Sequence, residues 1–241
     1  GLLRLLLSHF QRFVVLPANM AGNPSNLLGP PAQGTPSHAK SIATHCAGGP
    51  RICQASEPLA AVTVDRAKTV EAFLALTAQV GEMLQAAGAN TQLKLPRSQW
   101  TVAEAASHLV IAGRFFCELA AGAQAFYADG TREALADANA SKLQSFTERD
   151  GNQLADALDG VARTFLTAAA GRPGTMAVKT PMGPMDLDTL RSYLMTHTMR
   201  HGYPLARALG RALRIPKGYV TLALPFLSAP MTAVGGSPTV G

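Results

Sequence analysis

Three histidines stand at positions where a helical protein usually places an aliphatic residue. His197 and His201 are four residues apart in one segment, and His108 lies in another. The residues around them recur in alternating three- and four-residue steps, which is typical of a helix face turned towards a bundle interior. The inward positions are Ala105, His108, Ala112, Phe115 and Leu119 in the first segment, and Leu190, Leu194, His197, His201, Leu205 and Ala208 in the second.

A shared metal ion is one way to satisfy these imidazoles. A buried polar group left without a partner costs roughly 1–3 kcal/mol, and no Asp or Glu lies on the second stripe. Because residues i and i+4 are neighbours on a helix, His197 and His201 can reach one divalent cation, with His108 as the third ligand. The alternative is that each histidine is an ordinary core residue bonded to a backbone carbonyl or to water. Three histidines in register favour the metal, and three neutral ligands would leave it an open position, as in catalytic sites.

The composition narrows the class of protein. With 241 residues, of which 47% are hydrophobic and 15% charged, the chain can bury a core, and one main domain is expected. The net charge is +6, but the basic residues form no aromatic-interleaved ribbon, so no nucleic-acid partner is expected. Cys46, Cys53 and Cys117 form no C-x-x-C pair, which favours a reducing, cytoplasmic location. On a helix, Cys117 falls on the face opposite His108 and is not expected to be a ligand.

The chain divides into three parts. Residues 1–61 begin with short interrupted apolar runs and continue rich in Pro, Gly and Ser, which predicts a disordered or non-native N-terminal extension and no membrane span. Residues 62–215 carry helical patterns and predict the metal-binding bundle. Residues 216–241 predict an apolar terminal segment and tail.

Local signals place the helices of the bundle. Four are expected: from about Val64 to Ala87, from a Thr101–Glu104 capping box, over Asn152–Ala170, and from Asp186 or Asp188. The long polar connection after the second helix predicts a crossover or a short extra helix. Leu74 is expected in the core, residues 180–184 in a loop, and Pro204 at a kink. Apart from a short extended piece at residues 176–178, no sheet is expected.

Two stretches resemble the DinB-like superfamily. One is the Trp-Thr at residues 100–101, which opens the helix carrying His108. The other runs from His197 to Arg211 and contains H-x-x-x-H followed by G-Y-P-L-A-R-A-L-G-R. The branch that these motifs resemble most is the metal-binding domain of mycothiol-dependent maleylpyruvate isomerases, over about residues 64–213. The resemblance implies an all-α four-helix bundle with a long crossover between helices 2 and 3, and a divalent cation held by the three histidines.

The chain departs from the isomerase branch in its ligand set. That branch commonly has Glu where this chain has His197, and Asp where it has Pro204. Replacing a carboxylate by imidazole makes a metal site one unit more positive, which favours a bound thiolate or hydroxide. A three-histidine set is typical of other DinB-like members, including those associated with thiol S-transfer. The isomerases also carry a smaller α/β domain after the bundle. The residues that follow Leu213 are expected to be too few to form such a domain.

The resemblance also implies a low-molecular-weight thiol cofactor, mycothiol or a similar thiol. The predicted function is a metal- and thiol-dependent S-transferase or isomerase acting on a small electrophilic substrate, with zinc as the first metal and nickel or manganese as alternatives. Arg114 and Arg200 lie off the metal stripe and are interpreted as solvated surface residues. A metal-activated hydrolase and a non-catalytic metal-stabilised helical binding module stay open, as does a homodimer.

Overall fold

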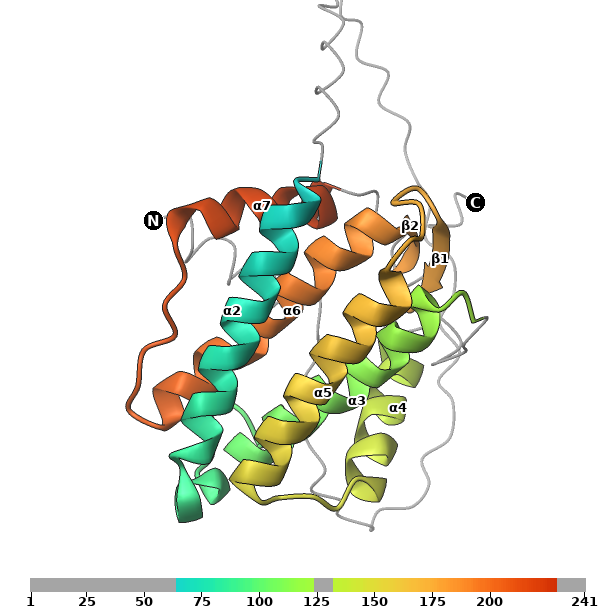
Figure 1. Cartoon of the computed structure of the whole chain (residues 1–241). Helices are drawn as coiled ribbons and strands as arrows, with labels where there is room; N and C mark the ends of the chain where they lie inside the picture. The colour runs from blue at the N-terminus through green and yellow to red at the C-terminus, as the bar shows by residue number, and fades with distance from the viewer. Residues whose placement is uncertain (1–63, 124–131, 229–241) are drawn as a thin grey trace, which may run out of the picture. The chain divides into compact units, whose positions relative to one another are not determined.

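The computed structural model describes residues 64–123 and 132–228 (Figure 1). The N-terminal extension predicted for residues 1–61 and the tail beyond residue 228 lie outside them. The described residues form six α-helices, one 3-10 helix and a two-stranded hairpin. In chain order these are α2 (Arg66–Gln85), η1 (Gly88–Gln92), α3 (Val102–Ala120), α4 (Arg132–Ser145), α5 (Gly151–Ala169), β1 (Ala177–Thr180), β2 (Gly183–Asp186), α6 (Leu187–Ala208) and α7 (Lys217–Ser228).

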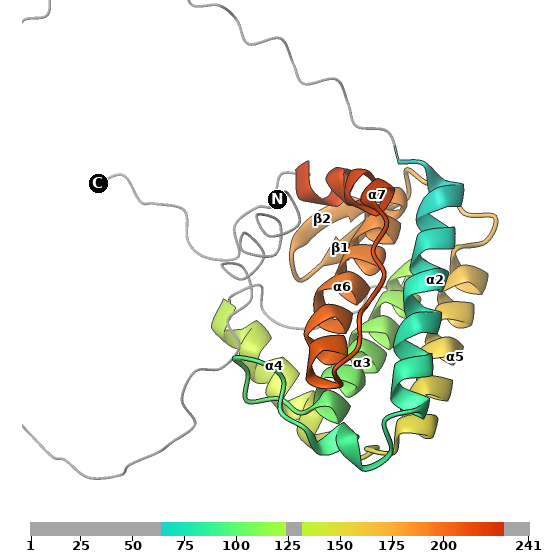
Figure 2. The same ribbon diagram turned by 90° about the vertical axis from the view of Figure 1, so that its left-hand side faces the viewer.

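Four long helices pack side by side around one core (Figure 2). Helix α3 contacts α5 and α6, and α2 contacts the same two helices. The largest side chains that are almost completely buried include Leu76, Leu84, Phe165, Leu190 and Leu205. Burying each such side chain stabilises the fold by roughly 1.5–3 kcal/mol before the entropy of ordering is counted. The predicted mainly helical domain is therefore confirmed.

The starts of these four helices follow from their capping residues. Asp65, Asp150 and Asp186 each accept a hydrogen bond from the backbone N–H three residues later. At α3 the predicted capping box is present: the Glu104 N–H donates to the Thr101 hydroxyl at 3.1 Å, and the Thr101 N–H donates to the Glu104 carboxylate at 2.7 Å. A side-chain cap of this kind contributes about 1 kcal/mol. The cap of α3 also fixes where the helix that carries His108 begins.

The hairpin between α5 and α6 is a correction to the sequence prediction. Residues 177–180 pair antiparallel with residues 183–186, so the segment expected to be a loop contains parts of both strands. Val178 is buried, and β1 contacts both α3 and α6. Such short strands carry almost no periodic signal, and their pairing is stabilised by packing against the two helices.

Three further expectations concern the helices. The long connection between α3 and α5 contains α4, which confirms the extra helix that was one of the two predicted alternatives. Leu74 is 37% exposed, so its assignment to the core was wrong, and Leu76 occupies the interior instead. Helix α6 continues through Pro204 to Ala208, so the proline does not end it, and a kink there stays a prediction. No helix within residues 64–123 and 132–228 combines the length and apolar character needed to span a membrane.

Candidate metal centre

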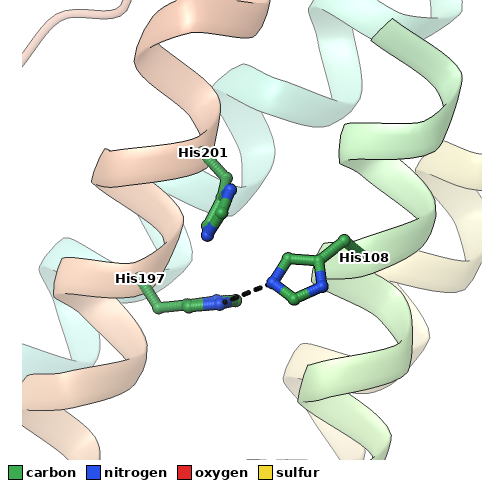
Figure 3. A group of neighbouring side chains, drawn as sticks. All are labelled: His108, His197 and His201. Atoms are coloured by element: carbon green, nitrogen blue, oxygen red, sulfur yellow. Dashed lines mark hydrogen bonds between the residues drawn. The ribbon is translucent and has the colours of Figure 1, made fainter. Parts of the chain in front are cut away.

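The three predicted histidines come together inside the bundle (Figure 3). His108 lies on α3, and His197 and His201 lie one turn apart on α6. Each is only 7% exposed, and one ligand nitrogen from each lies within 4.8 Å of the others. The ring centroids are 4.5–5.1 Å apart. Packing of α3 on α6 therefore converts a pattern in two separate segments into one cluster.

The spacing of the nitrogens fits a single cation. The Nε2 atoms of His108 and His197 are 3.2 Å apart. Two nitrogens bound to one tetrahedral zinc at ~2.0–2.1 Å are separated by about 3.3–3.4 Å, so this pair needs little movement to share an ion. Without an ion the same contact is a hydrogen bond in which one imidazole donates to the other. No carboxylate belongs to the cluster that the described residues form.

Burial keeps the imidazoles in the form that binds metals. Burial, together with the positive charge of Arg200, lowers the pKa of His108 to about 4. Burial also places the pKa values of His197 and His201 well below the ordinary value, and repulsion from His108 and Arg200 lowers both further. The three rings are thus neutral at neutral pH and offer lone pairs without first losing a proton.

The outer nitrogen of His108 is an exception to the usual surroundings of a metal ligand. A metal-bound imidazole normally donates its second N–H to a carbonyl, a carboxylate or water. Nδ1 of His108 is buried and has no hydrogen-bond partner among the described residues. The ring instead packs against Trp100, with centroids 5.0 Å apart. Ring packing therefore contributes to its orientation where a hydrogen bond usually would.

Trp100 forms one wall of the cluster. Its indole stacks on His201 with centroids 6.1 Å apart and an interplanar angle of 26°. The backbone around it is fixed, because its carbonyl accepts from the Leu95 N–H at 2.9 Å and its own N–H donates to the Ser98 hydroxyl at 3.0 Å. The sequence marks Trp100 as the residue before the cap of α3, and the structure adds contact with two of the three histidines.

Tyr193 and Phe116 lie on the other side of His197. The Tyr193 ring is 5.5 Å from the His197 ring, and the Phe116 ring is 6.4 Å from it. The two aromatic rings also contact each other in an edge-to-face arrangement at 5.1 Å. Tyr193 precedes His197 by four residues, so its place on the same helix face was a signal that sequence reasoning missed.

Arg200 contradicts its interpretation as a solvated surface residue. The side chain is partly buried, and this burial lowers its pKa. Its charge acts on all three histidines, which places a permanent cation close to the cluster. By contrast, Arg114 is exposed as expected, and its guanidinium lies 5.4 Å from the centre of the Phe146 ring. Sequence spacing alone could not distinguish the two, because both lie off the histidine stripe.

Cys117 takes no part in the cluster, as its helical position predicts. Its thiol donates to the Val161 carbonyl at 3.5 Å, on the side of α3 that faces α5. Burial raises the pKa of this thiol to about 11, so it stays protonated at neutral pH. A protonated thiol bonded to a carbonyl is neither a metal ligand nor a nucleophile.

Comparison with family models, with curated proteins and with solved structures finds no match for this chain. The structure itself shows a mainly helical domain with three buried histidines that can hold a metal ion.

Proposed function

We propose that His108, His197 and His201 together hold one divalent cation, with zinc as the first choice and nickel or manganese as alternatives. The observation that carries this proposal is the convergence of three buried, neutral nitrogens within 4.8 Å. Zinc favours imidazole ligands, and a three-histidine set with a fourth position left for an exchangeable ligand is typical of catalytic zinc. A closed structural site would require a fourth protein ligand, and the cluster contains only these three groups among residues 64–123 and 132–228.

The charge around the cluster favours an anionic ligand. Three imidazoles leave the +2 charge of the ion uncompensated, and Arg200 adds a further positive charge nearby. A thiolate is an anion whose soft sulfur suits zinc. When bound, the cation would stabilise the thiolate form of a small thiol at neutral pH. We therefore propose a low-molecular-weight thiol, such as mycothiol, as the ligand and thiol-dependent S-transfer or isomerisation as the reaction.

The residues around the cluster have separate roles in this proposal. Trp100, Tyr193 and Phe116 supply ring surfaces that limit the access of water to the ligand nitrogens. Arg200 supplies charge for an acidic group on the thiol or on the electrophile. The resemblance of the histidine-bearing segments to thiol-dependent DinB-like proteins points in the same direction.

Trp100 gives a direct test of the metal site. It is the only tryptophan in the chain, and its ring lies 5.0 Å from that of His108. Bound Co²⁺ or Ni²⁺ should quench its fluorescence with one equivalent at saturation, and His197→Ala should abolish this response. His38 and His45 provide matched controls, since His38→Ala and His45→Ala should leave the stoichiometry unchanged. No quenching and no metal retained after reconstitution with zinc, nickel or manganese would remove the basis of the site.

The cobalt protein then tests the ligand. Addition of mycothiol, bacillithiol or a simpler analogue should produce a sulfur-to-cobalt charge-transfer band, which His201→Ala should abolish. A spectrum that no thiol perturbs, together with turnover of ester or amide substrates without thiol, would replace the proposal by the hydrolase. A spectrum insensitive to every added ligand would indicate a metal-stabilised binding module.

A further inference from the structure

A cavity of about 480 Å³ lies at the end of the bundle where α2 and α6 begin and α5 ends. These three helix ends lie together at the top of Figure 1. The apolar part of the lining includes Val70, Leu166 and Ala169, and the polar part is three arginines, Arg66, Arg172 and Arg191. The volume falls within the range of about 300–1,000 Å³ that is common for small-molecule sites.

The arginines outnumber the carboxylates that contact them. Asp188 accepts two hydrogen bonds from Arg66, at 2.9 and 3.0 Å, and one from Arg191 at 2.6 Å. Arg172 forms no ion pair with a described residue, and its guanidinium donates to the backbone carbonyls of Ala168 on α5 and of Ala121, the residue that follows α3. Asp186 is not hydrogen-bonded to Arg191 and acts on it only through space. Positive charge is therefore in excess around an apolar surface.

Burial increases the demand for a counter-charge. The side chain of Arg191 is only 5% exposed, and the carboxylate that it contacts is shared with a second guanidinium. Removing an ion from water costs several kcal/mol unless opposite charge and hydrogen bonds compensate. A guanidinium cannot relieve this cost by losing its proton near neutral pH.

Capping of α5 explains only part of this arrangement. Arg172 donates to the Ala168 carbonyl at 3.1 Å and Arg191 to the Ala169 carbonyl at 3.2 Å, so both neutralise the negative end of α5. Arg66 reaches the same cavity from α2, and its guanidinium donates to Asp188 and not to the end of α5. Capping accounts neither for the third arginine nor for an open space bordered by aliphatic side chains.

We propose that this cavity binds a small organic anion, a carboxylate or phosphate attached to a short hydrocarbon group. The guanidinium groups of Arg66, Arg172 and Arg191 hold the anionic end, and Val70 and Leu166 contact the hydrocarbon. Guanidinium is suited to this because its planar set of donors matches carboxylate and phosphate oxygens. Arg191 precedes His197 by six residues on α6, or about 9 Å along the axis, and the cavity lining contains none of the three histidines. The site is therefore separate from the metal centre.

Calorimetric titration of the full chain at low salt with inorganic phosphate, acetate and hexanoate tests the proposal. All three should bind, and hexanoate should bind at least tenfold more tightly than acetate, because each CH₂ group that is buried can strengthen binding up to about fourfold. Arg66→Gln should weaken binding of each probe at least tenfold. Arg66 is the suitable position because its side chain is 51% exposed, so its loss should not prevent folding. Val70→Glu, which places a carboxylate in the lining, should abolish binding.

Two controls make the test decisive. Arg163 is an exposed arginine on α5 that pairs with Asp159 and does not line the cavity, so Arg163→Gln should bind all probes like the unmodified chain. His201→Ala should also retain binding, because the proposed anion does not contact the metal centre. Equal affinity in Arg66→Gln and Arg163→Gln, or no binding at millimolar concentrations, would overturn the proposal. Binding lost in His201→Ala but kept in Arg66→Gln would place the anion at the metal centre and overturn it as well.

Discussion

Helix α6 contributes to two polar clusters that differ in charge: one is positive and the other is neutral. Near its start, Arg191 is a permanent cation that shares the carboxylate of Asp188 with Arg66. Further along, His197 and His201 meet His108 as neutral rings with no carboxylate in the cluster. The first cluster has positive charge in excess and attracts anions, whereas the second offers lone pairs and attracts a cation.

The two clusters differ in how the cost of burying their side chains is reduced. Histidine can remain in its neutral form, and burial lowers the pKa of His108 to about 4 so that it does. Arginine stays charged, so Arg191 has to be compensated by Asp188 and by a backbone carbonyl. Removing a group from the histidine cluster should therefore act mainly on ligand binding. Removing a counter-charge from the arginine cluster should act mainly on folding.

The largest difference is expected for metal binding. His201→Ala should weaken metal affinity by more than about 100-fold, since loss of a ligand should exceed the 10–100-fold effect typical of an outer-shell partner. Arg66→Gln, in the other cluster, should leave it unchanged. Competition with a chromophoric chelator measures both affinities. Equal metal affinity in His201→Ala and the unmodified chain would break the assignment of cation binding to the histidine cluster.

Acidification should separate the clusters next. The metal-free protein should lose stability as the pH falls from about 6.5 to 4. In this range the histidines bind protons in the unfolded state, whereas in the folded state they remain neutral. The pKa of His108 at about 4 corresponds to a loss on the order of 3 kcal/mol at pH 4. Burial acts to raise the pKa of Asp188, but hydrogen bonds and charge from Arg66 and Arg191 together outweigh it and lower the pKa, so the stability from that carboxylate is lost only at still lower pH. Urea unfolding across this range should show the first loss in the unmodified chain and a smaller one in His108→Ala. If the free energy of unfolding fell equally with pH in the unmodified chain and in His108→Ala, the prediction would be wrong.

Removing a counter-charge should have the third-largest effect. Asp188→Asn leaves Arg191 buried without a contacting carboxylate and should cost about 2–3 kcal/mol, below the ~3–5 kcal/mol of a fully buried pair because Asp188 is partly exposed. Asp159→Asn removes a similar helical ion pair at the surface and should cost less than about 0.5 kcal/mol. Metal retention should be unchanged in both. Equal free energies of unfolding for Asp188→Asn and Asp159→Asn in urea would show that Arg191 does not depend on Asp188 as a counter-charge.

The smallest effect is expected from the cap of α3. Thr101→Ala removes the hydroxyl that accepts from the Glu104 N–H and should cost about 1 kcal/mol, whereas Thr101→Ser should cost less. Since Trp100 adjoins this cap, the fluorescence of the metal-free protein should also shift in Thr101→Ala. Anion binding in the cavity lined by Arg66, Arg172 and Arg191 should not change, because no residue of α3 lines that cavity. A change there would show that the two clusters are coupled.

Short-range rules in the sequence determined the helices and the histidines of the candidate site. Thr101 and Glu104 lie three residues apart, and the capping box that they form depends on little else. His197 and His201 share a helix face because four residues make about one turn. The inward direction of His108 follows from the apolar residues around it. These inferences succeed because each rests on residues within one or two turns of each other.

Only the tertiary structure decided what surrounds those residues. Arg66 and Asp188 are 122 positions apart, and no local pattern joins them. Leu74 fits an apolar pattern yet is exposed, because the packing of α2 on α5 and α6 selects which face is inside. Arg200 is partly buried beside the histidines for the same reason, and Trp100 reaches two of them only because α3 packs on α6. Helix periodicity is a property of the local chain, whereas a site's walls and charge balance depend on which helices become neighbours.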